Sequence, residues 1–242
     1  RRRIDASCDD PITKRIRRAS QVGPDTDSAK LKDADAMNLS LTTRRIALFA
    51  PTLPALTCGD HHLTYGAFEQ MTARIGGAFA TRWQLPPGSR VGIAMENAPE
   101  VLPVIYGAWR AGLTVVPVNA KLHPREIAWI LDNADAKVCV ATPDLAGKMS
   151  ETTGVSWPPM IVTGTREYRE LLAAEPIVCE PGDPDAIAWL FYTSGTTGRP
   201  KGAQLTHRNL LFMTLAYCTD IDPVGPGDTL LHGAPLSHGS GM

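Results

Sequence analysis

The sequence lacks the cysteine pattern of a structural zinc site or a disulfide-stabilised domain. It has five cysteines, an odd number, and no two of them are spaced as a CxxC pair. They are scattered along the whole chain: Cys8, Cys58, Cys139, Cys179 and Cys218. We therefore expect free thiols, most of them buried, in a protein of the reducing cytoplasm.

Long apolar runs and an excess of one charge sign are also missing. No stretch approaches the roughly 20 apolar residues of a membrane-spanning helix. The arginines at residues 1–3 are not followed by the apolar segment of a secretory signal. Lys and Arg number 24 and Asp and Glu number 25, which gives a formal net charge of -1. This balance gives no reason to expect a nucleic-acid partner or an acidic lipid surface.

The two ends of the sequence differ from its middle. Residues 1–36 contain few large apolar side chains and no periodicity, so we predict a disordered N-terminal extension. The sequence starts at Arg1 and stops at Met242, inside a glycine-rich turn, and Met37 is a candidate natural start. We therefore expect a fragment whose residues 37–242 form an incomplete domain.

The middle of the chain alternates between two kinds of pattern. Short apolar runs typical of buried strands occur at residues 91–95, 114–118, 137–141, 160–163 and 187–192. Amphipathic helical patterns lie between several of these runs. Strand–helix–strand spacing of this kind predicts an α/β fold with a parallel sheet built from right-handed βαβ units.

Local signals predict where several elements begin and end. Gly59-Asp60 lies between two short strand patterns and predicts a hairpin, and Thr64 is a candidate N-cap for the helix that follows. We expect Pro103 to kink the next helix or delay its start, and Gly112 to end it. Pro124 suits the first turn of a further helix.

A loop rich in hydroxyl groups follows the last apolar strand. Its sequence, from Thr193 to Gly202, is TSGTTGRPKG. Glycines allow backbone N–H groups to approach an anion closely, and Ser and Thr hydroxyls can donate hydrogen bonds to phosphate oxygens. Lys201 supplies a mobile positive charge. The composition therefore suits a polyphosphate site, although for an arbitrary loop rich in Gly and Thr an ordinary polar turn between two strands would be the favoured interpretation.

Two common phosphate-binding motifs do not fit this loop. A P-loop needs Gly before its lysine and Ser or Thr after it, whereas Pro200 precedes Lys201 and Gly202 follows it. The G-x-G-x-x-G motif of dinucleotide-binding folds is absent. A kinase-like protein is therefore disfavoured.

The segment YTSGTTGRPKG, residues 192–202, resembles the signature phosphate-binding loop of the adenylate-forming superfamily. That superfamily includes acyl-CoA synthetases, adenylation domains of peptide synthetases and luciferases. Weaker resemblance extends from Leu39 to the end, through LTYGAFEQMTARIGGAFA, RVGIAMENAPEVLPVIYGAWRAGLTVVPVN and LHPREIAWILDNADAKVCVA, in the expected order. The resemblance implies the truncated, parallel-sheet part of the large N-terminal AMP-binding domain of these enzymes.

The resemblance also implies a reaction. A carboxylate attacks the α-phosphorus of ATP bound to Mg²⁺, which gives an acyl-adenylate and pyrophosphate, and the thiol of CoA then takes the acyl group. The residues that it implies for gripping the β- and γ-phosphates are Thr193, Ser194, Gly195, Thr196, Thr197, Gly198 and Lys201. His238, in APLSHGSGM, matches the position that meets the acyl substrate and the α-phosphate. Ser237 stands where many acyl-CoA synthetases have an aromatic residue. No catalytic residue and no metal ligand is assigned.

Several functions remain open. An acyl-CoA ligase is the leading hypothesis; an amino-acid or aryl-acid adenylation enzyme and a non-catalytic, truncated nucleotide-binding remnant are the alternatives. The family's motif for adenine and magnesium, its ribose-binding aspartate and its small C-terminal domain are absent from this sequence, so we expect the fragment alone to be inactive. His207 is predicted to order the first turn of a helix rather than to take part in chemistry. We interpret Asp132 and Asp135 as helix-end and turn residues.

Overall fold

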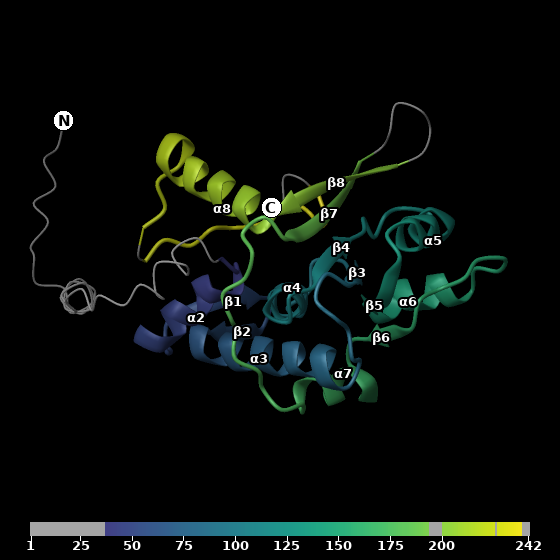
Figure 1. Ribbon diagram of the computed structural model, residues 1–242, viewed down its shortest axis with the longest axis horizontal. Coiled ribbons are helices and arrows are strands. Elements are labelled where there is room, and N and C mark those ends of the chain that lie inside the picture. The colour runs from purple at the N-terminus through teal and green to yellow at the C-terminus, as the bar shows by residue number, and fades with distance from the viewer. Residues whose placement is uncertain (1–36, 194–199, 226, 239–242) are drawn as a thin grey trace, which may run out of the picture. The chain divides into compact units, whose positions relative to one another are not determined.

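The structure, a computed structural model, describes residues 37–193, 200–225 and 227–238. The predicted disordered extension, residues 1–36, lies outside the described residues. At the centre of the described part is a six-stranded sheet with the strand order β6-β5-β3-β4-β7-β8 (Figure 1). Its strands are β3 (Arg90–Ala94), β4 (Thr114–Pro117), β5 (Ala136–Ala141), β6 (Met160–Val162), β7 (Ile187–Thr193) and β8 (Lys201–Thr206).

The sheet is parallel from β6 to β7, and β8 pairs with β7 in the antiparallel direction. The predicted α/β fold with a parallel sheet is therefore confirmed, and all five predicted strands are present. Strand β8 was not predicted from the sequence. Its residues KGAQLT are mostly exposed, as an edge strand allows, and they lack the apolar run that reveals a buried strand.

Helices cover both faces of the sheet (Figure 1). On one face lie α3 (Tyr65–Thr81), α4 (Val101–Arg110) and α7 (Arg166–Leu172). On the other lie α5 (Pro124–Asn133) and α6 (Pro143–Ser150). Successive side chains of a strand point to opposite faces: Val138 and Val140 of β5 join the first core, and Cys139 and Ala141 join the second. This two-sided burial explains why the strands are apolar throughout.

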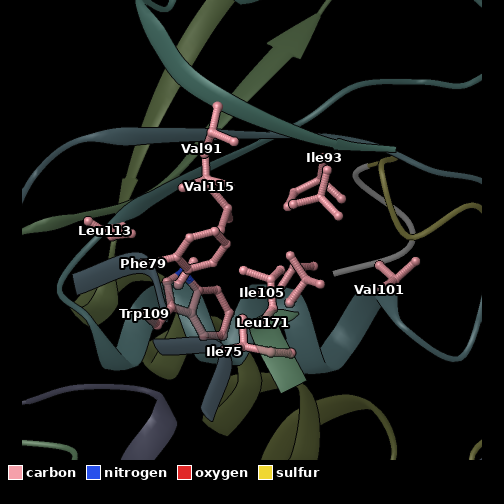
Figure 2. Packing of buried hydrophobic residues seen from close by; sticks show 14 of the residues in the cluster. Ile75, Phe79, Val91, Ile93, Val101, Ile105, Trp109, Leu113, Val115 and Leu171 are labelled. Atoms are coloured by element: carbon pink, nitrogen blue, oxygen red, sulfur yellow. The ribbon is translucent and has the colours of Figure 1, made fainter. Parts of the chain in front are cut away.

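The first core fixes α4 against the sheet. Figure 2 shows Phe79 of α3 and Ile105 and Trp109 of α4 packed below the strands that carry Val91 and Val115. The indole nitrogen of Trp109 also donates a hydrogen bond of 2.8 Å to the backbone oxygen of Ala188 in β7. The strand that leads into the hydroxyl-rich loop is thereby attached to the most deeply buried helix layer.

The predicted local signals are mostly confirmed. The hairpin consists of β1 (Pro54–Cys58) and β2 (His61–Thr64), and the Thr64 hydroxyl caps α3 by accepting a hydrogen bond of 3.2 Å from the Ala67 amide. Pro124 is the first residue of α5. Gly112 follows α4 with a φ of +72°, a conformation that glycine adopts without strain.

The prediction that Pro103 delays its helix is wrong. Helix α4 begins at Val101, and Pro103 lies in its first turn. The backbone N–H groups of a first turn have no partner inside the helix, so proline removes no hydrogen bond there.

Two further α-helices and a short π-helix lie in the described part. Helix α2 (Ser40–Phe49) contacts α3, and α8 (His207–Ala216) follows β8 and continues into the short π-helix η2 (Tyr217–Ile221). No described helix is long and apolar enough to cross a membrane. Cys139 and Cys179 are buried, Cys58 and Cys218 are half-buried, and all four are free thiols, whereas Cys8 lies outside the described residues.

Candidate functional site at the carboxyl edge of the sheet

The hydroxyl-rich loop joins the two antiparallel strands β7 and β8. Thr193, the last residue of β7, is the direct partner of Lys201, the first residue of β8. Both residues are exposed. The strand pairing therefore places the hydroxyl and the ammonium-bearing side chains at the two ends of one loop. The other predicted phosphate-binding residues, Ser194, Gly195, Thr196, Thr197 and Gly198, lie outside the described residues.

Tyr192 attaches the base of this loop to helix α5. Its hydroxyl donates a hydrogen bond of 2.8 Å to the side-chain oxygen of Asn133, and its ring meets Trp129 edge-on at 6.4 Å between centroids. Burial raises the pKa of the Tyr192 hydroxyl, so it stays a neutral donor. The resulting contact holds the end of β7 where the loop begins.

Gly202 makes room for the Tyr192 ring. The two residues are partners across the β7–β8 ladder. A Cβ atom at Gly202 would lie 3.0 Å from Cζ of Tyr192, closer than nearly all real contacts of this kind. The glycine after Lys201 is thus explained by the side chain opposite it, which the sequence alone did not reveal.

The segment that carries His238 is bound to the end of strand β3. Asn97, three residues after β3, donates a side-chain hydrogen bond of 2.9 Å to the backbone oxygen of Ala234. Its side-chain oxygen accepts one of 2.8 Å from the Leu236 amide. The backbone amide of His238 donates to the oxygen of Pro235 at 2.9 Å and closes a turn. Sequence reasoning missed Asn97, although a polar residue shortly after a buried strand was a usable signal.

A hollow of about 240 Å³ lies beside these contacts. It is lined by residues 95–97 after β3, residues 119–121 after β4, and Gly233, Pro235 and Ser237. Ligands of open α/β sheets bind outside the carboxyl ends of the strands, which is where this hollow lies. The described residues thus bring the His238 segment, but not the Lys201 side chain, to the wall of the hollow.

His207 supports the fold, as predicted. It is the first residue of α8, it is buried, and its Nδ1 accepts a hydrogen bond of 3.3 Å from the Leu39 amide. Its ring meets Trp109 edge-on at 6.0 Å. Burial lowers the pKa of His207 to about 4, so the ring is neutral at neutral pH and can act as an acceptor.

The acidic residues near α5 also have structural roles. Asp132 lies in the last turn of α5, and Asp135 follows the helix with a φ of +51°. The Asp135 carboxylate forms ion pairs with Arg90 and Lys137, and the hydrogen bond from Lys137 lowers its pKa. Within the described ranges, no group of His, Cys, Asp and Glu side chains is arranged to hold a metal ion.

Comparison with known proteins identifies the chain's relatives. The family model described as AMP-binding enzyme matches residues 44–242. Sulfoacetate–CoA ligase of Cupriavidus necator is 31% identical over 206 residues, which cover 79% of this chain and 39% of that protein. Long-chain-fatty-acid–CoA ligase FadD13 of Mycobacterium tuberculosis is 30% identical over 210 residues, covering 83% of this chain and 41% of that protein.

A solved structure is also similar to this chain. The inhibitor-bound N-terminal domain of FACL13 from Mycobacterium tuberculosis matches with a TM-score of 0.74 and 28% identity. The match covers 83% of this chain and 52% of that one. The chain therefore spans about half of this domain structure, and 39% and 41% of the two curated relatives.

Proposed function

Because the chain belongs to the AMP-binding enzyme family, we propose that the protein carrying it is an AMP-forming acid–CoA ligase. Such an enzyme joins a carboxylic acid to ATP, releases pyrophosphate, and passes the acyl group to the thiol of CoA. The observation that carries the proposal is the pairing of Thr193 with Lys201 at the two ends of the hydroxyl-rich loop. The relatives support it, since they are named as ligases of sulfoacetate and of long-chain fatty acids.

The loop acts on the leaving group. As the acid's oxygen bonds to the α-phosphorus, the bond between that phosphorus and the bridging oxygen of the β-phosphate breaks. Negative charge then accumulates on pyrophosphate. The hydroxyls of Thr193, Ser194, Thr196 and Thr197, the backbone amides of Gly195 and Gly198 and the Lys201 ammonium stabilise that charge. Strand pairing holds Thr193 and Lys201 opposite each other at the loop's two ends.

We expect Mg²⁺ to bind together with ATP. Mg²⁺ in nucleotide sites is commonly held by substrate phosphates, one or two carboxylates and water rather than by a cage of protein side chains. An exposed threonine hydroxyl beside an exposed lysine is a donor set that suits a polyphosphate carrying its own cation. The chain's own contribution is to orient the β- and γ-phosphates.

His238 and the hollow beside its segment form the part of the site that receives the carboxylic acid substrate. His238 lies at the end of the turn that starts at Pro235, and Ser237 lines the hollow. A serine leaves more room there than an aromatic side chain would. We infer that the carboxylic acid enters from this side, with His238 close to its carboxylate and to the α-phosphate.

Carboxylate-dependent exchange of labelled pyrophosphate into ATP tests the proposal. The complete protein would be given ATP, Mg²⁺ and a panel of fatty, aryl, sulfonated and amino acids. One class of acid should stimulate exchange, and adding CoA should then yield its thioester. Exchange with no acid of the panel would contradict the ligase assignment, and exchange without a thioester would favour an adenylation enzyme with another acceptor.

A further inference from the structure

Asn97 links two parts of the chain that are far apart in sequence. Its two hydrogen bonds reach residues 137 and 139 positions away. The side-chain nitrogen of Asn97 donates to the Ala234 carbonyl, and its side-chain oxygen accepts from the Leu236 N–H. The side-chain amide thus pairs with the backbone as a residue of a neighbouring β-strand would. Both bonds end on backbone atoms, so they fix the path of the chain at Ala234 and Leu236 rather than the position of one side chain.

The surrounding chain contributes little to holding this segment. Residues 228–233 form neither helix nor strand, and Leu230 and Leu231 are 63% and 97% exposed. The side chain of Leu236 is partly buried against the first core. Asn97 and Leu236 therefore both contribute to anchoring the segment that leads to His238.

The geometry connects this anchor to His238. The Leu236 amide is held by Asn97, and the next turn is closed by the bond from the His238 amide to the Pro235 oxygen. Residue 238 is thus only two positions beyond an anchored backbone atom. A change in the anchor would shift the His238 backbone and alter where its imidazole lies.

We propose that Asn97 is the positioning residue for His238, a role that rests on the proposed function of His238 in acid activation. Asn97 acts through the backbone of residues 234–236 and has no part in bond making. Displacing a reacting group by about 1 Å can cost roughly a hundredfold in rate, so a lost anchor should reduce turnover substantially.

Hydrogen–deuterium exchange tests the anchor without relying on activity. In the complete protein, Asn97→Ala should speed exchange of the Leu236 amide roughly fivefold, the factor that corresponds to the loss of one typical hydrogen bond. Arg74→Ala is the matched control, since Arg74 donates a similarly long-range bond of 3.0 Å to the Ala174 oxygen elsewhere in the fold. Equal exchange at Leu236 in all three proteins would overturn the proposal.

A double-mutant cycle then tests the link to His238. In pyrophosphate exchange, Asn97→Ala should lower the rate about tenfold or more with little change in KM for ATP. Combined with His238→Ala it should add nearly nothing, because both changes remove the same positioned side chain. Asn97→Asp, which keeps the acceptor for Leu236 but loses the donor to Ala234, should fall between wild type and Asn97→Ala. It also replaces the alanine variant if that one does not fold.

The outcomes separate the two proposals. Additive losses from Asn97→Ala and His238→Ala would overturn the positioning role, as would equal activity of wild type and Asn97→Ala. If no acid stimulates exchange in the wild-type protein, the proposed function fails, and the exchange of the Leu236 amide still decides whether Asn97 anchors the segment.

Discussion

Helices α4 and α8 are both ten residues long, but α4 buries eight of its residues and α8 buries two. Helix α4 precedes the loop and packs against strands on one side and α3 on the other. Helix α8 follows the loop, and Phe212, Met213 and Leu215 on it are exposed. Stability is therefore concentrated before the loop. Lys201 and the residues around His238 lie in the part of the described chain where fewer residues are buried, as is common for sites that must admit a ligand.

The buried ion pair between α3 and α4 should show the largest effect on stability. Glu69 Oε1 lies 2.5 Å from Nη2 of Arg110, whose side chain is only 2% exposed. Removing the partner of a buried charge is costly, so Glu69→Ala should lower the free energy of unfolding by about 3 kcal/mol. Urea unfolding measures this.

The control is a surface carboxylate on α7. Glu170 pairs with Arg166 and Arg82, whose side chains are 82% and 55% exposed. Glu170→Ala should lower the free energy of unfolding by less than about 1 kcal/mol. Similar losses in both variants would contradict the larger contribution assigned to the buried ion pair between α3 and α4.

Lys201→Ala should show the opposite behaviour, with a loss of activity and no loss of stability. Removing one group that stabilises developing charge commonly costs about a hundredfold in rate. Pyrophosphate exchange of the complete protein measures the rate, and thermal unfolding the stability. Lys148→Ala, at an exposed position of α6, is the control and should change neither. Unchanged turnover in Lys201→Ala would refute the role given to this lysine.

His207 at the start of α8 contacts the Leu39 amide and the Trp109 ring of α4. Its burial should make the free energy of unfolding depend on pH. Its pKa in the folded protein is about 4, below the usual 6.5, so the unfolded chain binds the proton more readily between these values. Its contribution is therefore complete above pH 6.5 and is lost as the pH falls toward 4. Between pH 7 and pH 5 this amounts to about 2 kcal/mol of unfolding free energy.

The variant His207→Asn should reduce this pH dependence of the unfolding free energy, because it removes the buried imidazole. Urea unfolding at the two pH values supplies the numbers. An unaltered pH dependence in His207→Asn would mean that another group titrates.

A substitution on the exposed face of α8 should have the smallest effect on stability. Phe212 is 60% exposed, so Phe212→Ala should change the unfolding free energy of the 242-residue chain by no more than about 0.5 kcal/mol. Leu210 is 6% exposed, and Leu210→Ala should cost about 2 kcal/mol. A large loss from Phe212→Ala would show that this face is packed after all.

The sequence could predict the features of the fold that depend on neighbouring residues, but not those that depend on distant partners. The buried strands, the N-cap at Thr64 and the first-turn proline at Pro124 depend on neighbouring residues, so their patterns are visible in a short stretch. Strand β8 lies at the edge of the sheet and lacks an apolar run, so only its pairing with β7 defines it. Pro103 was misjudged because its effect depends on where the helix begins.

The site was predictable only in part, for a related reason. The hydroxyl-rich loop is contiguous, so its residue types alone are enough to suggest phosphate chemistry. The partners of Asn97 are 137 and 139 positions away, and Tyr192 meets Asn133 across the sheet edge. Such contacts require the fold to be known. The roles of Ser194, Gly195, Thr196, Thr197 and Gly198 stay predictions.

A structure of the complete protein with ATP and Mg²⁺ tests the central claim most directly. The β- and γ-phosphates should lie within hydrogen-bonding distance of the loop from Thr193 to Gly198, with the Lys201 ammonium beside them and the α-phosphate toward His238. Phosphates bound away from that loop would contradict the ligase mechanism, and the α/β fold alone would remain.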